Sequence, residues 1–190
     1  RQKRYRSYKG QIGKVAPNLL NRDFTATRPN QKWVTDVTEF KVQGQKIYLS
    51  PILDLFNGEV ISYSLSTSPS FPTTIEMLKK AFRRLPEKVD LMLHSDQGWQ
   101  YQMRPYQMLL AERGIQQSMS RKGNCYDNAV IENFFGLLKS EFFNGQVFQS
   151  VDVFQKELVD YLEYYNNDRI KVKLKGLSPV AYRTQSNSFT

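Results

Sequence analysis

Three acidic residues have the types and positions needed to bind metal ions beside a phosphate group. Asp36 lies in the run WVTDVTEF, Asp96 in LHSDQGWQY and Glu132 in DNAVIENFFGLLKSE. The two aspartates interrupt strand-like segments, and Glu132 stands on a helix with strong apolar periodicity. Carboxylates that converge from two strands and a helix supply the hard oxygen ligands of a pair of Mg²⁺ ions and leave sites open for phosphate and water. Unpaired charge within apolar segments is costly, which favours a functional role for these three.

The charge of the chain indicates where that phosphate comes from. The 190 residues include 27 Lys and Arg against 18 Asp and Glu, a net charge of +9. Such an excess favours a polyanionic partner or an anionic surface, and we expect the phosphate to be that of a nucleic acid. A hydrophobic content of 40% is ordinary for a folded domain and argues against disorder.

Other features of the chain bear on its location. No apolar run approaches the roughly 20 residues of a membrane span, and nothing resembles a signal peptide. The single cysteine, Cys125, excludes an internal disulfide and fits a reducing cytosol. We therefore expect a cytoplasmic protein. Because the chain begins with Arg1 rather than Met, we also expect it to be part of a longer protein.

The order of the predicted elements is that of a ribonuclease H-like α/β domain. β-Branched and aromatic runs predict three antiparallel strands first, over residues 32–42, 46–56 and 59–66. Asn57-Gly58 suits a tight hairpin turn, whereas Pro51 weakens the second strand because proline cannot donate to the ladder. Two further short strands complete a mixed five-stranded sheet, at residues 90–96 and 115–120. Helical periodicity predicts flanking helices near residues 72–85, 105–114 and 128–143 and after Ser150.

These elements divide the chain into three parts. Residues 1–26 are basic, weakly periodic and broken by Pro17, which indicates an N-terminal arm or linker. Residues 27–185 form the predicted catalytic core with its C-terminal helices, and residues 186–190 form a tail.

The helix over residues 128–143 combines a metal ligand with a cation. Glu132, Gly136 and Lys139 are four and seven residues apart and therefore share one face. Gly136 would let a DNA backbone approach the helix, and Lys139 could bind a phosphate near the cut. The residue that caps this helix is predicted to be Asp127 or Asn128.

Simpler explanations suit several other charged residues. Asp54, Glu59, Asp152 and Glu157 are interpreted as solvated surface charges. His94 is expected to support Asp96 from behind rather than to bind metal.

The motifs resemble the catalytic core of the D-D-E transposase and retroviral integrase superfamily, most closely the family-three insertion-sequence transposases. The resemblance rests on four ordered blocks: WVTDVTEF, HSDQGWQY, SRKGNCYDNAVIENFFGLLKSE and YNNDRIKVKLKGLSPVAYR. The 35 residues between Asp96 and Glu132 and the lysine seven residues after Glu132 also match the family. One departure is Lys171, where many members carry a histidine, so we assign no catalytic proton transfer to this C-terminal block.

The resemblance implies a mechanism and a set of site residues. Asp36, Asp96 and Glu132 would bind two Mg²⁺ ions, with Mn²⁺ as a substitute, and catalyse DNA strand cleavage and strand transfer. The DNA partners would be element ends and target DNA, and the active complex would be a homo-oligomer. Contacts to DNA are predicted for Lys139, Arg121, Lys122 and Arg169, and supporting roles behind the metal ligands for His94 and Asn128.

Two alternatives remain open from the sequence. A ribonuclease H-like nuclease would use the same metals to cut DNA without joining it. A catalytically inactive remnant of a transposase would only bind DNA. The long interval before Glu132 and the spacing to Lys139 favour a transposase over the first, and the three intact acidic residues argue against the second.

Overall fold

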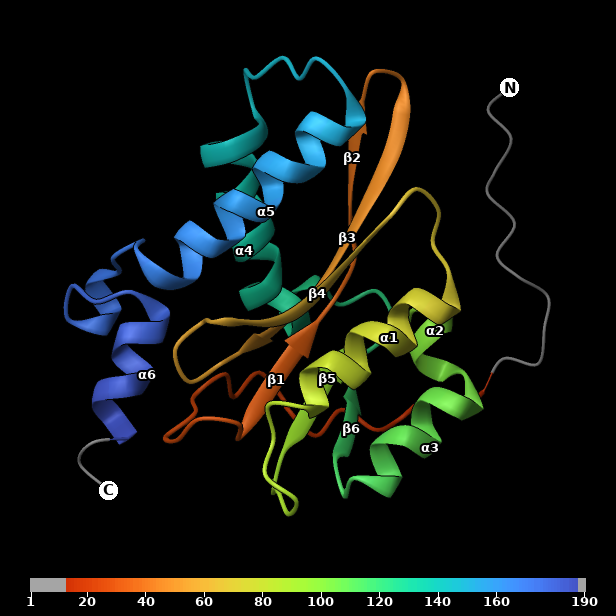
Figure 1. The fold of residues 1–190 in the computed structure, drawn as a ribbon. Coiled ribbons are helices and arrows are strands. Elements are labelled where there is room, and N and C mark those ends of the chain that lie inside the picture. The colour runs from red at the N-terminus through yellow and green to blue at the C-terminus, as the bar shows by residue number, and fades with distance from the viewer. Residues whose placement is uncertain (1–12, 188–190) are drawn as a thin grey trace.

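The fold is built on one mixed β-sheet with helices on both faces (Figure 1). The computed structural model describes residues 13–187; residues 1–12 and 188–190, which include part of the predicted arm and most of the predicted tail, lie outside the described part. Within the described residues no helix is both long and apolar enough to cross a membrane.

The long strand β3 (Gln45–Asp54) organises one half of the sheet. On one side it pairs antiparallel with β4 (Val60–Ser66). On the other side it pairs antiparallel first with β2 (Thr38–Val42) and then with β1 (Lys32–Thr35). The three antiparallel strands that open the predicted sheet are therefore present, but the single strand predicted over residues 32–42 is divided in two.

Pro51 gives a physical reason for this division. Thr35 pairs with Ile52 and Thr38 pairs with Leu49, so the same register places Pro51 opposite Asp36. Proline has no N–H group to donate to the ladder. The chain leaves strand geometry at Asp36 and Val37, and the expected five strands become six in five sheet positions.

The second half of the sheet is parallel. β1 pairs with β5 (Met92–Ser95), which pairs in turn with β6 (Gln116–Met119). Both short strands lie within the segments predicted for them. Because β1 and β5 run in the same direction, their carboxyl ends meet at one edge of the sheet.

Each face of the sheet carries its own hydrophobic core. On one face lie α1 (Phe71–Phe82), α2 (Trp99–Gln102) and α3 (Arg104–Glu112), which pack around Trp33, Ile52 and Leu93. On the other lie α4 (Ala129–Leu138), a π-helical turn (Lys139–Phe143) and α5 (Val151–Asn167). The helix predicted over residues 128–143 is thus α4 and its π-helical extension, preceded by the 3₁₀ turn Cys125–Asn128. The short 3₁₀ turn Val172–Leu174 and α6 (Pro179–Asn187) were not predicted as separate elements.

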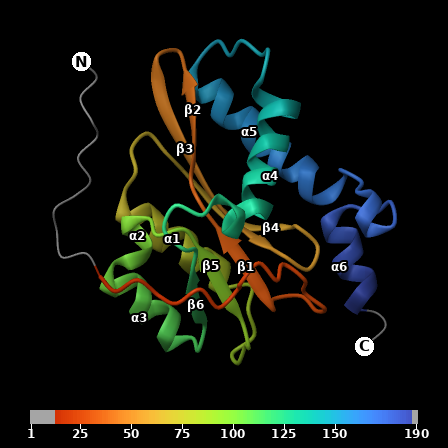
Figure 2. The same ribbon diagram turned by 180° about the vertical axis from the view of Figure 1, so that it is seen from behind.

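The described part of the predicted arm lies against the core. Figure 2 shows this segment running past β6 before it enters β1. Met119 donates its N–H to the carbonyl of Pro17, and Leu20 is buried among core residues. Residues 13–26 are therefore packed along the sheet rather than free of it.

Two carboxylates interpreted as surface charges, Asp54 and Glu59, are instead buried, and that interpretation was wrong. Asp54 forms an ion pair with Arg183 of α6, and Glu59 pairs with Arg183 at 2.8 Å and with Arg84 at 2.5 Å. The partner cations come from α6 and from the residues after α1, so sequence-local patterns could not reveal them. Asp152 and Glu157 are exposed, as predicted.

We predict that Arg183→Ala lowers the free energy of unfolding by about 3 kcal/mol or more, because it leaves two buried carboxylates with fewer cations. Urea unfolding measures this change. The control is Arg28→Ala, which removes an exposed pair with Asp90 and should cost less than about 1 kcal/mol. Equal losses in the two variants would show that the buried network does not anchor α6.

Candidate active site

Asp36 and Asp96 occupy equivalent positions on neighbouring parallel strands. Asp36 is the first residue after β1 and Asp96 the first after β5. Val34 pairs with His94, so the same register places Asp36 beside Asp96. Adjacent strands lie about 4.8 Å apart, a separation at which two carboxylates can share an ion.

Backbone N–H groups orient both aspartates. Val37 donates its N–H to Oδ1 of Asp36 at 2.7 Å, and Gly98 donates to Oδ1 of Asp96 at 2.8 Å. A Cβ atom at Gly98 would lie 2.9 Å from that same Oδ1 of Asp96. A side chain at this position would displace the carboxylate, so Gly98 belongs to the site although the sequence analysis did not single it out.

Glu132 lies at the same cleft as the two aspartates but belongs to helix α4. It is exposed in the first turn of α4, while Ile131, Phe134, Phe135 and Leu138 of that helix face the core. Asp36, Asp96 and Glu132 all line one cleft of about 490 Å³. The structure therefore brings together the three carboxylates that the sequence predicted to act jointly.

The pKa values of the two aspartates reflect this crowding. Burial raises the pKa of Asp36 to about 7, with further increases from the negative charges of Asp96 and Glu132. Burial also raises the pKa of Asp96, against the lowering effect of the Gly98 N–H. Placing negative charge on all three groups is thus unfavourable unless a cation compensates it.

The donor set fits a hard divalent cation. Three carboxylates around one open cleft are the ligands that Mg²⁺ prefers, and their mutual repulsion is what a cation relieves. Among residues 13–187 no three ligating side chains are already gathered closely enough to hold an ion, so these side chains must move closer together for tight coordination.

The remaining wall of the cleft is formed by the loop after β6. Ser120, Arg121, Lys122, Gly123 and Asn124 line it, together with Gln97 and Asn128. Gln97 donates its side-chain amide to the carbonyl of Ser120 at 3.0 Å, which links this loop to the segment after β5. Of the basic residues predicted to contact DNA, Arg121 and Lys122 are therefore at the cleft.

The other two predicted DNA contacts lie elsewhere. Lys139 does not line the cleft; its ammonium lies 5.7 Å from the ring centre of Phe40. Arg169 forms a two-pronged ion pair with Glu141, whose carboxylate also accepts a hydrogen bond from Tyr161 at 2.8 Å. Both positions are outside the group of residues that surrounds the carboxylates.

Of the two residues predicted to support the metal ligands, Asn128 lines the cleft and His94 does not. His94 is buried, and its Nδ1 lies 2.8 Å from Oγ of Ser118. That oxygen already accepts the N–H groups of Leu19 and Leu20, so its own hydrogen is left for Nδ1. Burial lowers the pKa of His94, which keeps the ring neutral. Asn128 is the N-cap residue of α4, but its side chain makes no capping hydrogen bond.

Asp127, predicted only as a possible cap of the following helix, is also a residue of the site region. Its side chain is buried and accepts hydrogen bonds from Arg121, Arg22 and Asn18. Arg121 in particular holds the pKa of this carboxyl well below its usual range. The partners are up to 109 residues distant in the sequence, so no local signal identifies them.

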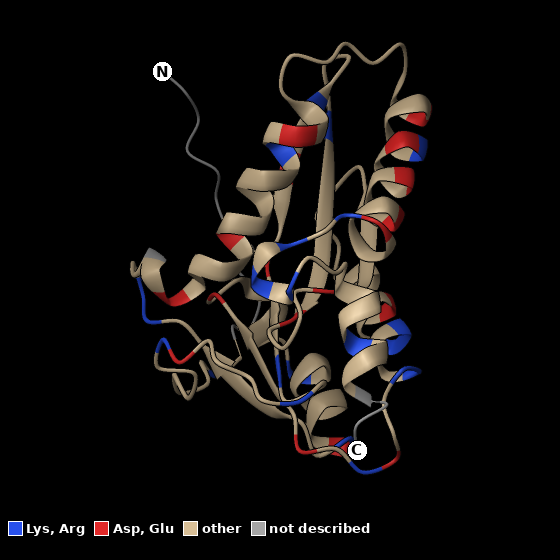
Figure 3. Cartoon of the chain, turned by 90° about the vertical axis from the view of Figure 1, so that its left-hand side faces the viewer, with Lys and Arg blue, Asp and Glu red and all other residues tan. Residues whose placement is uncertain are grey.

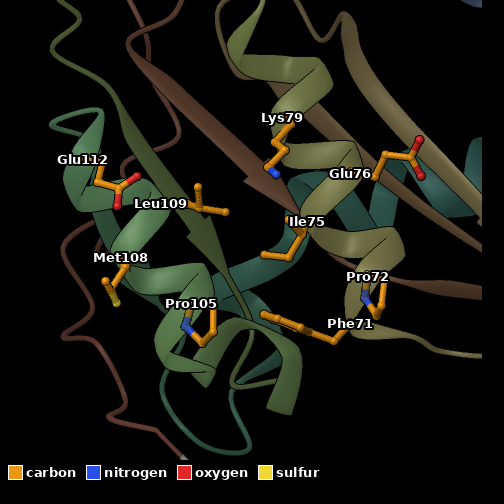
Figure 4. A pocket seen from close by; sticks show the side chains of 9 residues that line it. All are labelled: Phe71, Pro72, Ile75, Glu76, Lys79, Pro105, Met108, Leu109 and Glu112. Carbon is orange, nitrogen blue, oxygen red and sulfur yellow. The ribbon is translucent and has the colours of Figure 1, made fainter.

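A second groove is unrelated to this chemistry. It lies between α1 and α3, encloses about 590 Å³ and is largely apolar (Figure 4). Phe71, Ile75 and Leu109 contribute to its walls, with Glu76 and Glu112 at its sides. None of the predicted site residues lines it.

Known proteins match most of this chain in sequence. A family model described as an integrase core domain matches residues 26–125, and a second model of the same description matches residues 132–186. A protein of Escherichia coli K12 named as the transposase InsK of insertion sequence element IS150 is 60% identical over 184 residues, which are 97% of this chain and 65% of that protein. An uncharacterized transposase-like protein of Haemophilus influenzae is 58% identical over 96% of this chain and 84% of its own length.

Solved structures show the same fold. The integrase catalytic core domain of HTLV-2, determined in complex with magnesium in a trimeric form, superposes with a TM-score of 0.64. The identity is 18%, and the match covers 84% of this chain and 99% of that domain. A chain of the simian T-cell lymphotropic virus intasome matches with a TM-score of 0.66 and 20% identity, over 85% of this chain and 56% of its own length. The mixed sheet and flanking helices are thus those of the ribonuclease H-like integrase cores, as predicted.

The raised pKa of Asp36 predicts a pH-dependent stability in the metal-free protein. Between about pH 4 and 7 the unfolded chain has lost the proton and the folded chain retains it, so stability falls as the pH rises through this window. Asp36→Asn removes that loss. We expect the free energy of unfolding of the variant, relative to that of the wild type, to be on the order of 2 kcal/mol higher at pH 8 than at pH 5. Urea unfolding in the presence of EDTA measures this difference.

Asp23→Asn is the control, because Lys32 lowers the pKa of that exposed carboxyl and no comparable gain should follow. A pH-independent difference between Asp36→Asn and the wild type would refute the crowding of charges at the cleft.

Proposed function

Since the chain belongs to the integrase core domain family and is related to insertion-sequence transposases, we propose that it is the catalytic core of a DNA transposase. The chain spans 65% of the length of the Escherichia coli relative, so the activity of the whole protein is part of this proposal. The observation that carries it is the convergence of Asp36, Asp96 and Glu132 on one cleft from β1, β5 and α4. We propose residues 27–185 as the catalytic unit.

The proposed reaction consists of two phosphoryl transfers. In the first, the oxygen of a water molecule bonds to a phosphorus at the element end, and the bond from that phosphorus to the 3′ oxygen breaks. In the second, the freed 3′-hydroxyl attacks a phosphodiester of the target, whose own 3′ oxygen leaves. The proton of each attacking group passes to solvent, and the leaving oxygen takes up a proton, so no covalent protein intermediate is required.

The three carboxylates would hold two Mg²⁺ ions, for which Mn²⁺ should substitute. When bound, such ions would stabilise the charge at phosphorus as Lewis acids and would lower the pKa of the attacking water. The backbone donors Val37 and Gly98 orient the aspartates, and the mutual repulsion of the carboxylates favours uptake of cations. That the HTLV-2 domain was determined with magnesium supports this choice of ion.

The distribution of charge supports DNA approaching from the cleft side. Helix α5 carries exposed acidic residues along its length, which would repel a phosphate backbone (Figure 3). These residues are Asp152, Glu157, Asp160 and Glu163, against the single lysine Lys156. Lys122 is exposed at the cleft, and we propose it as a phosphate contact. Arg169 is engaged by Glu141, so its predicted contact with DNA would require that pair to open.

An open strip on α4 supports a further contact. Gly136 is exposed, and a Cβ atom built there meets nothing within 4 Å. A glycine inside a helix costs about 1 kcal/mol relative to alanine, and no internal contact here requires it. DNA lying along this strip would pass from Glu132 toward Lys139. We also propose that a homo-oligomer forms the active complex, as the trimeric and dimeric forms of the HTLV-2 domain support.

We predict that Asp96→Asn and Glu132→Gln each reduce both cleavage and joining by about a thousandfold or more, because each removes a metal-binding charge while preserving shape. Binding of element-end DNA should change less than about threefold, since phosphate contacts dominate it. Mg²⁺ should raise the melting temperature of the wild type and not of these variants.

Labelled element-end DNA, with Mn²⁺ and a target plasmid, measures the two steps separately. Near-normal joining in either variant of an active full-length protein would reject the catalytic assignment. Cleavage by the wild type without joining would favour the nuclease alternative, and binding without cleavage would favour the inactive remnant.

Lys139 is proposed to contact a phosphate and not a metal ion. Seven residues of α-helix place its Cα roughly 10 Å along the axis from that of Glu132, too far for a shared ion. Lys139→Ala should lower the slope of log affinity against log salt by about one phosphate contact without changing the Mn²⁺ affinity. Lys156→Ala, on the acidic face of α5, is the matched control and should leave the slope unchanged. Lost metal binding with unaltered DNA affinity would reverse the assignment.

A further inference from the structure

We propose that Asp127 is a positioning residue that holds the cleft loop, residues 121–124, in place by tying it to the N-terminal segment, residues 18–22. The inference rests on the proposed function for its effect on catalysis. Its structural part concerns the order of the cleft loop and stands apart from any activity.

The carboxylate of Asp127 is fully buried, and both of its oxygens accept hydrogen bonds. Oδ2 accepts the backbone N–H of Arg121 at 3.0 Å, its Nε at 3.0 Å and the side-chain amide of Asn18 at 2.9 Å. Oδ1 accepts Nη2 of Arg121 at 2.9 Å and Nε of Arg22 at 3.0 Å. Two arginines thus neutralise one carboxylate, and hydrogen bonds to charged groups are the stronger kind.

These contacts fix the cleft loop at both ends. Arg121 is held directly by Asp127, through its backbone and its guanidinium. Asn124 is held through Arg22, whose Nη2 donates to its Oδ1 at 3.1 Å. Both residues line the cleft that contains the three carboxylates, so the wall of the cleft is attached to the N-terminal segment at two points.

The N-terminal segment adopts a costly conformation to make these contacts. Asn21 and Arg22 have φ values of 44° and 62°, in the left-handed region that residues other than glycine rarely adopt. The turn is supported by the Asn21 N–H, which donates to Oδ1 of Asn18 at 2.9 Å. Strain of this kind persists only where the surroundings hold the backbone in place. Here they do so through the carboxylate of Asp127, which accepts from Asn18 and Arg22, and through Oγ of Ser118, which accepts the N–H groups of residues 19 and 20.

Asp127 also precedes the helix that carries Glu132. It is followed by Asn128, the N-cap residue of α4, and Glu132 lies in the first turn of that helix. The carboxylate of Asp127 therefore fixes the position of the cleft loop relative to Glu132. Removal of its charge would leave Arg121 and Arg22 without their partner and the loop free to move.

The test compares the wild type with Asp127→Asn and Arg22→Ala in the full chain. Asp23→Asn is the matched control, because Asp23 lies in the same part of the chain and pairs with Lys32 without touching the loop. Hydrogen exchange of the amides of residues 122–124 in metal-free protein should be about tenfold faster in Asp127→Asn and increased in Arg22→Ala, but unchanged in the control. Arg22→Ala retains the contacts between Arg121 and Asp127, so it still tests the proposal if Asp127→Asn fails to fold.

Strand cleavage at saturating Mn²⁺ and a series of DNA concentrations, well below the melting temperature, gives the second measurement. We expect kcat to fall about tenfold in Asp127→Asn with a smaller change in KM. The reason is that an ordered cleft loop affects the reaction of bound DNA more than the binding of DNA. Unchanged exchange of the loop in both test variants would overturn the proposal, as would a mobile loop with normal kcat. A wild-type chain that never cuts DNA would overturn the proposed function, and the exchange rates would still decide whether Asp127 orders the loop.

Discussion

The parallel pairing of β1 with β5 is the constraint on which the rest of the site depends. Its register places Asp36 and Asp96 side by side at the carboxyl ends of the two strands. Parallel strands cannot be joined by a tight turn, so residues 36–91 must leave the site and return to it. That detour contains β2, β3, β4 and α1, and it builds most of the sheet and part of each of its two cores. The antiparallel half of the fold is thus the connection that allows two aspartates to meet.

Bringing the aspartates together has an electrostatic cost, which the raised pKa of Asp36 expresses. The surrounding backbone reduces this cost only in part, through one N–H donor to each aspartate. Elsewhere the buried acids Asp54, Glu59 and Asp127 form ion pairs with arginines. The contrast between carboxylates paired with arginines and cleft carboxylates without such partners supports the proposed cation site.

The arginine-paired acids share a further property, because each connects segments that are distant in the sequence. Asp54 and Glu59 attach α6 to the end of β3 and the start of β4, and Asp127 attaches the N-terminal segment to the cleft loop. Charge therefore performs two functions in this fold. Unpaired carboxylates form the candidate site, and paired ones hold the outer segments against the sheet that supports it.

The sequence by itself determined the identity of the three cleft carboxylates, the order of the main elements and the family, because these follow from local periodicity and from fixed spacings along the chain. It did not determine that the first strand breaks at Asp36, since the cause, Pro51, becomes its neighbour only through the β3 register. It also could not distinguish Asp54, Glu59 and Asp127 from solvated acids. The cations that bury them come from other parts of the chain, and whether a carboxylate is paired is decided only when tertiary structure brings its partner within hydrogen-bonding distance.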